Sequence, residues 1–365
     1  MTGGGISRRA FLSGVGGAAA GLAAAPPLTA CGSRAGRSVA GSRSADVLVV
    51  RDIGGSYGEA NRKALYDPFT QETGIPVRVV NLLHEQLLAE IEAGRTPCDV
   101  ADTNMSLLAL FQRKGVTEEL DYDRLGNARK AGIAKSLLLS HGVGKAYWAS
   151  VLAYRTDAFG GRKPESWAHF WDVGAFPGRR ALQSELDWPE LEFALLADGV
   201  PIDELYPLDV GRAFRVLDEI KGSVHALWDN GAEPAELLNR GEVAASSAWL
   251  GRLQAPAGRG SRLAYEWNGA RRQSNGYGIL KGAANPGAAY RFIDFALRPE
   301  VQAHFARSYP NGPVVPAAYA HLSESTAANL PSTPGHLRSG FDLDVEWWLE
   351  NQHSVTKRWR AWARA

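Results

Sequence analysis

The stretch DVLVVRDIGGSYGEANRKALYDPFTQETGIPVRVV, residues 46–80, decides the fold class of this chain. It begins with an apolar run at residues 47–50, which is typical of a β-strand covered on both faces. Three elements follow in order: a glycine-rich turn at 54–58, a helix at 59–73 and a second strand at 76–80. A strand–helix–strand unit predicts a parallel sheet, and therefore an α/β protein.

The same alternation continues along the chain. Pro68 lies inside the first expected helix and should bend or split it. Trp359 and Trp362 lie one helical turn apart, which favours a C-terminal helix packed on a lobe. We expect further strands at 99–101, 151–154, 180–183 and 243–249, and helices at 84–93, 106–114, 189–196, 208–220, 234–240, 287–297 and 299–308.

Composition narrows the class of protein. The 365 residues, 45% of them hydrophobic, predict two domains with substantial cores. Five of the 40 Lys and Arg residues lie in residues 1–45, which hold no acid, so 35 bases face 39 acids in the remainder. That net charge of −4 argues against a nucleic-acid partner. Two cysteines are too few for a disulfide framework or a Cys-rich zinc site.

The N-terminal residues predict export and a lipid anchor. Arg8 and Arg9 precede Phe-Leu, which fits a twin-arginine signal, and residues 15–28 form its apolar region. The sequence Leu-Thr-Ala before Cys31 fits a bacterial lipobox, so residues 1–31 would be the signal and Cys31 the lipidated first mature residue. Residues 32–45 hold Gly, Ser, Arg and Ala with one Val, which predicts a flexible linker. We therefore expect a membrane-anchored protein outside the cytoplasm.

One motif suggests an enzyme. Ser56 lies in a Gly-x-Ser-x-Gly pattern between a strand and a helix, as in the nucleophile elbow of serine hydrolases. The alternative is a nest of backbone N–H groups that binds polar ligand atoms. His84 and Glu85 begin a zincin pattern, but Leu88 stands where the second histidine is required. We expect no metal and no cofactor.

Two further places could contact a ligand. Glu185 and Asp187 lie between a strand and a helix, where they would either reach a cleft or cap the helix. Trp249 and Arg252 follow an apolar run. An indole beside a guanidinium can pack against a ligand and pair with its carboxylate, although a core tryptophan is the alternative.

Several segments together resemble the spermidine/putrescine-type solute-binding proteins of bacterial ABC importers. They are residues 54–57, 67–75, 152–157, 164–171, 238–243, 249–252 and 289–295. The resemblance implies an α/β, two-lobe periplasmic-binding-protein-like (type II) fold, with a ligand cleft between lobes joined by crossover strands. It also implies a monomer without catalytic activity that binds a small-molecule solute and delivers it to an ABC permease in the membrane.

Lobes and ligand contacts follow from that resemblance. Lobe 1 would comprise residues 46–150 and 281–320, and lobe 2 residues 151–280 and 321–365, with crossovers near 149–154 and 277–280 and a late return to lobe 2 near His321. The expected ligand-binding residues are Ser56, Tyr57, Asn104, Ser106, Trp148, Glu185, Trp188, Trp249, Arg252, Asn275 and Tyr277.

The chain departs from the polyamine-binding pattern. Where the family carries Glu-Gly and then Trp-x-Asp, this chain has Asn268-Gly269 and then Gln273-Ser274-Asn275. A polycation would lack the acids that its burial requires. We therefore expect a small zwitterion or carboxylated amine, with polyamine-like compounds as the family default. An exported serine hydrolase that uses Ser56, and a structural surface lipoprotein, remain the alternatives.

Overall fold

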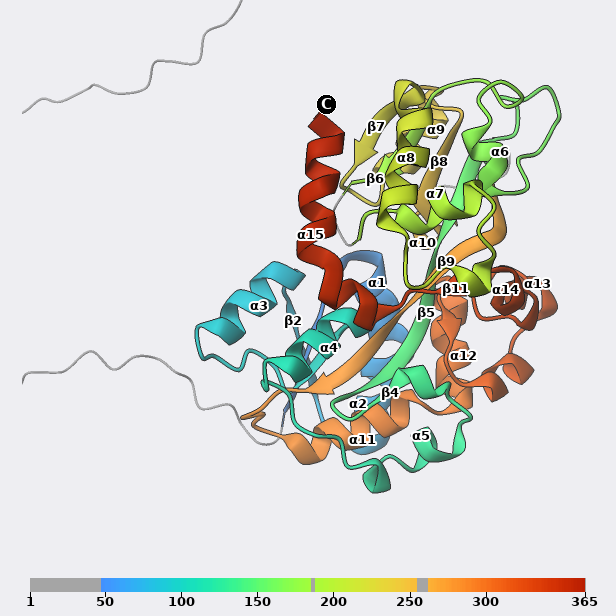
Figure 1. Ribbon diagram of the computed structural model, residues 1–365. Helices are drawn as coiled ribbons and strands as arrows, with labels where there is room; N and C mark the ends of the chain where they lie inside the picture. The colour runs from blue at the N-terminus through green and yellow to red at the C-terminus, as the bar shows by residue number, and fades with distance from the viewer. Residues whose placement is uncertain (1–46, 185–187, 255–261, 365) are drawn as a thin grey trace, which may run out of the picture. The chain divides into compact units, whose positions relative to one another are not determined.

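The computed structural model describes residues 47–364 apart from 185–187 and 255–261 (Figure 1). Its strands form one mixed sheet in the order β2-β1-β3-β9-β5-β8-β6-β7, with three short strands that pair with β5 or β9. β1 pairs with both β2 and β3 in parallel, which confirms the parallel sheet expected from residues 46–80. The main strands are β1 (Leu48–Asp52), β2 (Val77–Asn81), β3 (Val100–Asn104), β5 (Gly142–Arg155), β6 (Arg180–Gln183), β7 (Val224–Trp228), β8 (Ala245–Trp249) and β9 (Leu263–Ile279). The short ones are β4 (Leu138–Leu139), β10 (Gly312–Pro313) and β11 (Phe341–Asp342).

The first helical segment starts earlier than the sequence predicts. Gly54 and Gly55 have φ angles of 70° and 60°, in the left-handed region that favours glycine, and α1 (Gly55–Asn61) follows at once. The expected split occurs as a π-helical turn, Arg62–Tyr66, before α2 (Asp67–Thr73). Pro68 lies in the first turn of α2, directly after this π-helical turn.

Hydrophobic side chains gather into two large cores and a smaller third cluster. The first core joins β1 and β3 to α1, α4, α11 and α12. The second joins α6, α7, α8 and α15, and the third lies around β8 and α9. These helices are α4 (Met105–Arg113), α6 (Trp167–Trp171), α7 (Leu191–Ala197), α8 (Val210–Ile220), α9 (Glu233–Arg240), α11 (Pro286–Ala296), α12 (Pro299–Ser308) and α15 (Val345–Arg364). The remaining ones are α3 (His84–Glu92), α5 (Gly126–Lys130), α10 (Leu250–Gln254), α13 (Glu324–Ala327) and α14 (Pro334–Ser339).

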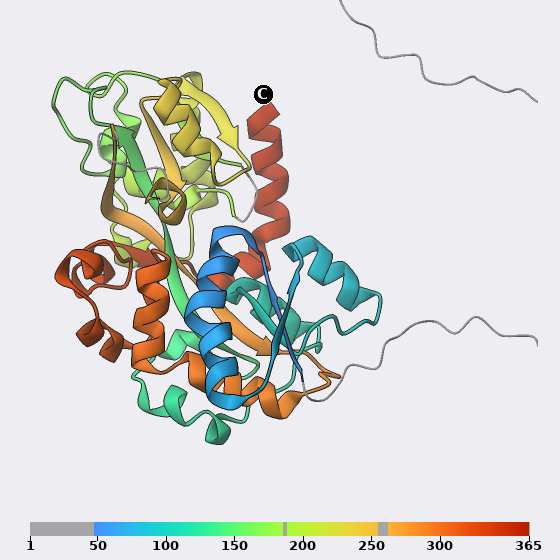
Figure 2. The same ribbon diagram turned by 180° about the vertical axis from the view of Figure 1, so that it is seen from behind.

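Two long strands connect these cores. β5 and β9 run antiparallel through the middle of the molecule and pair from Val143↔Tyr277 to Arg155↔Leu263 (Figures 1 and 2). The pairing register shifts between Gly144 and Ala146 and again between Ser150 and Leu152. β9 pairs with β3, a strand of the first core, from Asn275 onward. This strand therefore crosses between the cores before residues 277–280, where the sequence analysis places the crossover. The result is a two-lobe α/β architecture joined by β5, by β9 and by a third crossing, in which the chain passes from the first core at Val315 to the second core at Phe341.

The C-terminal helix packs as predicted. Trp348, Trp359 and Trp362 of α15 are buried in the second core. Near its start, Glu346 forms an ion pair of 2.5 Å with Arg113 of α4. Among the helices of the described residues, none combines the length and apolar character needed to cross a bilayer.

Candidate ligand cleft

A cavity of about 360 Å³ opens where the two lobes meet β5 and β9. Its volume lies in the range of small-molecule sites. The carboxyl ends of the parallel strands β1 and β3 reach it, which is the usual position of ligands in open α/β sheets. The lining residues are Arg51, Ile53, Tyr57, Leu83, His84, Glu85, Asp102, Thr103, Asn104, Trp148, Ala149, Trp249, Gly251, Arg252, Asn275, Tyr309 and Asn311.

Aromatic rings form much of the wall. Trp148 and Trp249 meet edge to face with centroids 5.8 Å apart, and Tyr57 meets Tyr309 in the same way at 5.5 Å. Trp249 is half-buried rather than enclosed, and its Nε1 donates to Gln183 Oε1 at 3.3 Å. Such rings can pack against a ligand's alkyl chain or face its cationic group.

The charged side chains around the cavity differ in burial and in their partners. Arg252 is exposed on α10, and among the described residues no carboxylate pairs with its guanidinium. Arg51 is buried and donates to the carbonyl oxygens of Leu82 and Asp102. Glu85 is exposed at the start of α3. Burial lowers the pKa of His84 to about 4, so this side chain is neutral at physiological pH.

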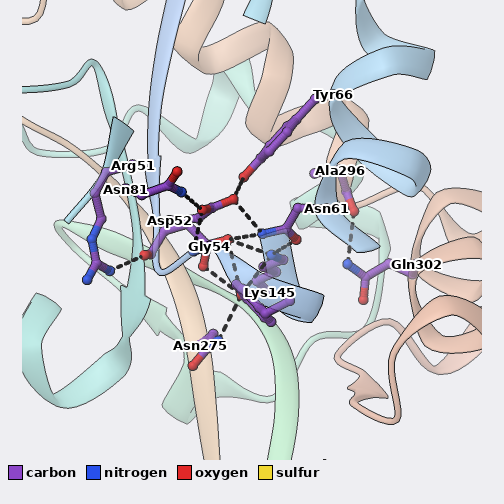
Figure 3. A network of polar contacts seen from close by, with 12 residues as sticks. Arg51, Asp52, Gly54, Asn61, Tyr66, Asn81, Lys145, Asn275, Ala296 and Gln302 are labelled. Atoms are coloured by element: carbon purple, nitrogen blue, oxygen red, sulfur yellow. Dashed lines mark hydrogen bonds and ion pairs between the residues drawn. The ribbon is translucent and has the colours of Figure 1, made fainter. Parts of the chain in front are cut away.

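A buried ion pair lies beneath the cavity (Figure 3). Lys145 Nζ donates to Asp102 Oδ2 at 2.5 Å, to Asn61 Oδ1 at 2.6 Å and to Tyr57 Oη at 2.8 Å. The side chains of Lys145 and Asp102 are 0% exposed. Burial raises the pKa of Asp102 and lowers that of Lys145, and their attraction opposes both shifts. All three ammonium hydrogens of Lys145 are therefore used.

A second carboxylate holds the turn after β1. Asp52 accepts hydrogen bonds from Gly54 N at 2.8 Å, Asn81 Nδ2 at 2.7 Å and Tyr66 Oη at 2.9 Å (Figure 3). Asn61 Nδ2 adds a longer contact of 3.3 Å. These bonds fix the turn that places Tyr57 beside the cavity.

The structure brings six of the sequence-predicted residues together at the cavity. They are Tyr57, Asn104, Trp148, Trp249, Arg252 and Asn275. Their contacts with a ligand stay predictions. Glu185, Asp187 and Cys31 lie outside the described residues.

Four predicted residues do not line the cavity. Ser56 is exposed on α1, and Ser106 lines a separate cavity of about 70 Å³ beside Tyr147 and Arg272. Trp188 stacks on Trp348 at 5.3 Å in the second core. Tyr277 is fully buried against Phe292, because β9 has passed from the cavity into the first core by that position.

Sequence reasoning also missed lining residues. Tyr309 and Asn311 follow α12, and no local pattern marks them, since tertiary packing alone brings them to the cavity. Asp102 could have been identified from the sequence, because an acidic residue within a buried strand requires a polar partner.

The hydrolase alternative gains nothing from the geometry. Within the described residues, no hydrogen bond joins Ser56 to a histidine. Across residues 47–364, outside the two gaps, no three His, Cys, Asp or Glu side chains could hold a metal ion.

Comparisons with known proteins agree with the fold. Residues 64–332 match the family described as bacterial extracellular solute-binding protein. The chain is 33% identical to the gamma-aminobutyric acid-binding protein of Pseudomonas aeruginosa, over 87% of this chain and 90% of that protein. An ABC transporter substrate-binding protein from Bradyrhizobium japonicum has a TM-score of 0.80 at 34% identity, covering 87% of this chain and 99% of the other. The periplasmic binding protein AgtB of Agrobacterium tumefaciens R10, in complex with agropinic acid, has a TM-score of 0.74 at 30% identity, covering 88% and 100%. The chain therefore belongs to the family of bacterial extracellular solute-binding proteins.

Proposed function

We propose that the solute captured by this ABC-importer binding protein is a small carboxylated amine, of the ω-amino acid or opine type. The observation that carries the proposal is Arg252, whose guanidinium lies at the cavity with no carboxylate partner among the described residues. A ligand carboxylate can take that place through a charge-assisted, bidentate contact.

The acids around the cavity argue against a polyamine. The charge of Asp102 is offset by Lys145 at 2.5 Å, which leaves Glu85 as the acid without an ion pair among the described lining residues. A diamine brings two positive charges, and each buried charge needs a partner. The ligands named for two relatives, gamma-aminobutyric acid and agropinic acid, are both acids.

The route of export and the attachment to the membrane belong to the same proposal. The family is extracellular, and we propose that this chain is exported through the twin-arginine signal and held on the membrane by a lipid on Cys31. A lipid-anchored receptor stays near the permease that it supplies.

The lobes and the absence of catalysis are also proposed. We assign residues 46–150 and 281–320 to lobe 1 and residues 151–280 and 321–365 to lobe 2, which close on the ligand as a monomer. Ser56 performs no acyl transfer in this proposal, and a fluorophosphonate probe should therefore leave it unlabelled. Labelling of Ser56 would restore the hydrolase alternative.

Titration calorimetry tests the ligand class. We expect 4-aminobutyrate or an opine to bind more tightly than putrescine or spermidine. In a thermal-shift assay, a ligand at 100 times its Kd adds about 2.7 kcal/mol of stability. Arg252→Gln should weaken binding of the carboxylated ligand by about tenfold to a hundredfold, as for loss of a charged hydrogen bond.

A matched variant controls for the loss of positive charge. Arg215 is exposed on α8 and does not line the cavity, so Arg215→Gln should leave the affinity unchanged. Tighter binding of spermidine or putrescine than of any carboxylated amine would overturn the proposed ligand class.

A further inference from the structure

Two asparagines face each other across neighbouring strands at the cavity. Asn104 ends β3 and pairs directly with Asn275 of β9, and both line the cavity. A carboxamide has a donor end, Nδ2, and an acceptor end, Oδ1. Which end each side chain turns to the cavity therefore decides what chemical group it recognises.

The orientation of Asn104 is set by the helix that it caps. The backbone N–H of Leu107 donates to Asn104 Oδ1 at 2.7 Å, at the start of α4. A backbone N–H can only donate, so the atom that it reaches must be the carbonyl oxygen. Nδ2, a donor, is the end that remains for the cavity.

The orientation of Asn275 is set by the buried network (Figure 3). Tyr57 Oη lies 2.8 Å from Asp102 Oδ1, and its one hydrogen goes to that carboxylate, which only accepts. Lys145 donates to the same Tyr57 oxygen at 2.8 Å. The atom of Asn275 that lies 2.8 Å from Tyr57 Oη must therefore be the donor Nδ2. Oδ1, an acceptor, is the end that remains for the cavity.

Neither amide can reverse without breaking this network. Tyr57 is 4% exposed, Asp102 2% and Lys145 0%, so water cannot replace a lost partner among them. Reversal of Asn275 would place its oxygen against a tyrosine oxygen that has no hydrogen to give. Reversal of Asn104 would place its amide hydrogens against the N–H of Leu107.

We infer that Asn104 and Asn275 fix the direction in which the ligand binds, with its carboxylate at Asn104 Nδ2 and its amine at Asn275 Oδ1. The inference rests on the proposed function, because it takes the ligand to be a carboxylated amine. A diamine placed the same way would set a donor against the donor of Asn104, which is a repulsive element against that class of ligand.

Two substitutions at Asn104 test the inference with 4-aminobutyrate and putrescine as probes. Ser and Asp both serve as helix N-caps, so Asn104→Ser and Asn104→Asp keep the bond to Leu107 N and should unfold at similar denaturant concentrations. Asn104→Asp should weaken 4-aminobutyrate binding by about tenfold or more, since the donor is gone. Asn104→Ser keeps one O–H donor on a shorter side chain, so it should weaken binding less than Asn104→Asp does. Asn104→Asp should in addition strengthen putrescine binding, because a carboxylate now meets an ammonium group.

Two more variants complete the design. Asn275→Ala should weaken binding of both probes, because both carry an amine. Asn268 lies on the same strand, is exposed and donates to the Glu165 carbonyl oxygen away from the cavity, so Asn268→Asp is the matched control and should change neither affinity.

The outcomes separate this inference from the proposed function. A wild type that binds 4-aminobutyrate, combined with an Asn104→Asp variant whose affinities for both probes stay within twofold, overturns the inference alone. Equal loss of both probes in Asn104→Asp also overturns it. A wild type that prefers putrescine, or binds neither 4-aminobutyrate nor an opine, contradicts the proposed function itself.

Discussion

Replacing Lys145 by methionine removes the positive charge that balances Asp102 beneath the cavity. The substitution deletes three hydrogen bonds of 2.5–2.8 Å and leaves a carboxylate whose side chain is 0% exposed without its ion partner. Breaking a buried pair from one side costs about 3–5 kcal/mol. Lys145→Met should therefore lower the free energy of unfolding by that amount at pH 7, measured by urea denaturation with tryptophan fluorescence.

The pH dependence of the same variant gives a sharper signature. Burial already raises the pKa of Asp102, and without Lys145 the opposing attraction is lost. A carboxyl group with a folded pKa above its unfolded value, about 3.9, stabilises below that value and loses this contribution as pH rises through its folded pKa. The stability of Lys145→Met should therefore fall, as pH rises above about 4, relative to the double variant Lys145→Met/Asp102→Asn, which carries no such group.

The double variant also measures the coupling of the pair. It should be more stable than Lys145→Met at pH 7, because a neutral amide is less costly to bury than an unpaired carboxylate. The reasoning fails if Lys145→Met unfolds within about 1 kcal/mol of wild type. It fails equally if the two variants show the same pH profile.

Four other changes have definite expected results. Burial raises the pKa of Glu190 to about 7, so the stabilising contribution of this group is lost as pH rises through 7. In urea titrations, the free energy of unfolding of Glu190→Gln relative to that of the wild type should therefore rise by roughly 2–4 kcal/mol between pH 5 and pH 8. Trp348→Phe removes a bond of 2.8 Å to Glu192 and should lower the unfolding free energy by about 1–3 kcal/mol. In Gly276→Ala, the new Cβ would lie 2.7 Å from the Val143 carbonyl oxygen, and calorimetry should show a loss of about 1–3 kcal/mol. Cys31→Ser should move the protein from the membrane fraction to the soluble fraction on cell fractionation, and retention on the membrane would contradict the lipid anchor.

Local patterns predicted much of the fold. The apolar run at 47–50 and the predicted helix end at residue 73 lie where the structure has β1 and the end of α2, because both depend on neighbours in the sequence. The start of α1 was misplaced, since a glycine-rich segment reads as a turn although Gly55 opens the helix. Pro68 correctly indicated an interruption, but not that a π-helical turn would accommodate it.

The candidate site was less accessible to sequence reasoning. Alternation along β9 places Asn275 and Tyr277 on one face, but it cannot tell where the strand leaves the cavity and enters the first core. Trp188 comes soon after β6 in the sequence, a position from which a side chain could reach the cleft. In the structure it stacks on Trp348 and lies in the second core instead. The positions of Tyr309 and Lys145 depend on partners more than 80 residues away, such as Asn61 and Tyr57.

The pairing of β5 with β9 has a mechanical consequence. Because β5 and β9 are hydrogen-bonded neighbours, these two connections between the lobes move together rather than independently. Hydrogen bonds between the two strands oppose the sliding of one strand past the other, which favours hinge movement over shear movement of the lobes. The pairing register shifts at 144–146 and 150–152, and irregularities of this kind bend a strand. In the closure that we propose, hinge movement would bring Arg252 toward the opposite wall of the cavity, where β3 and β9 end their pairing at Asn104 and Asn275.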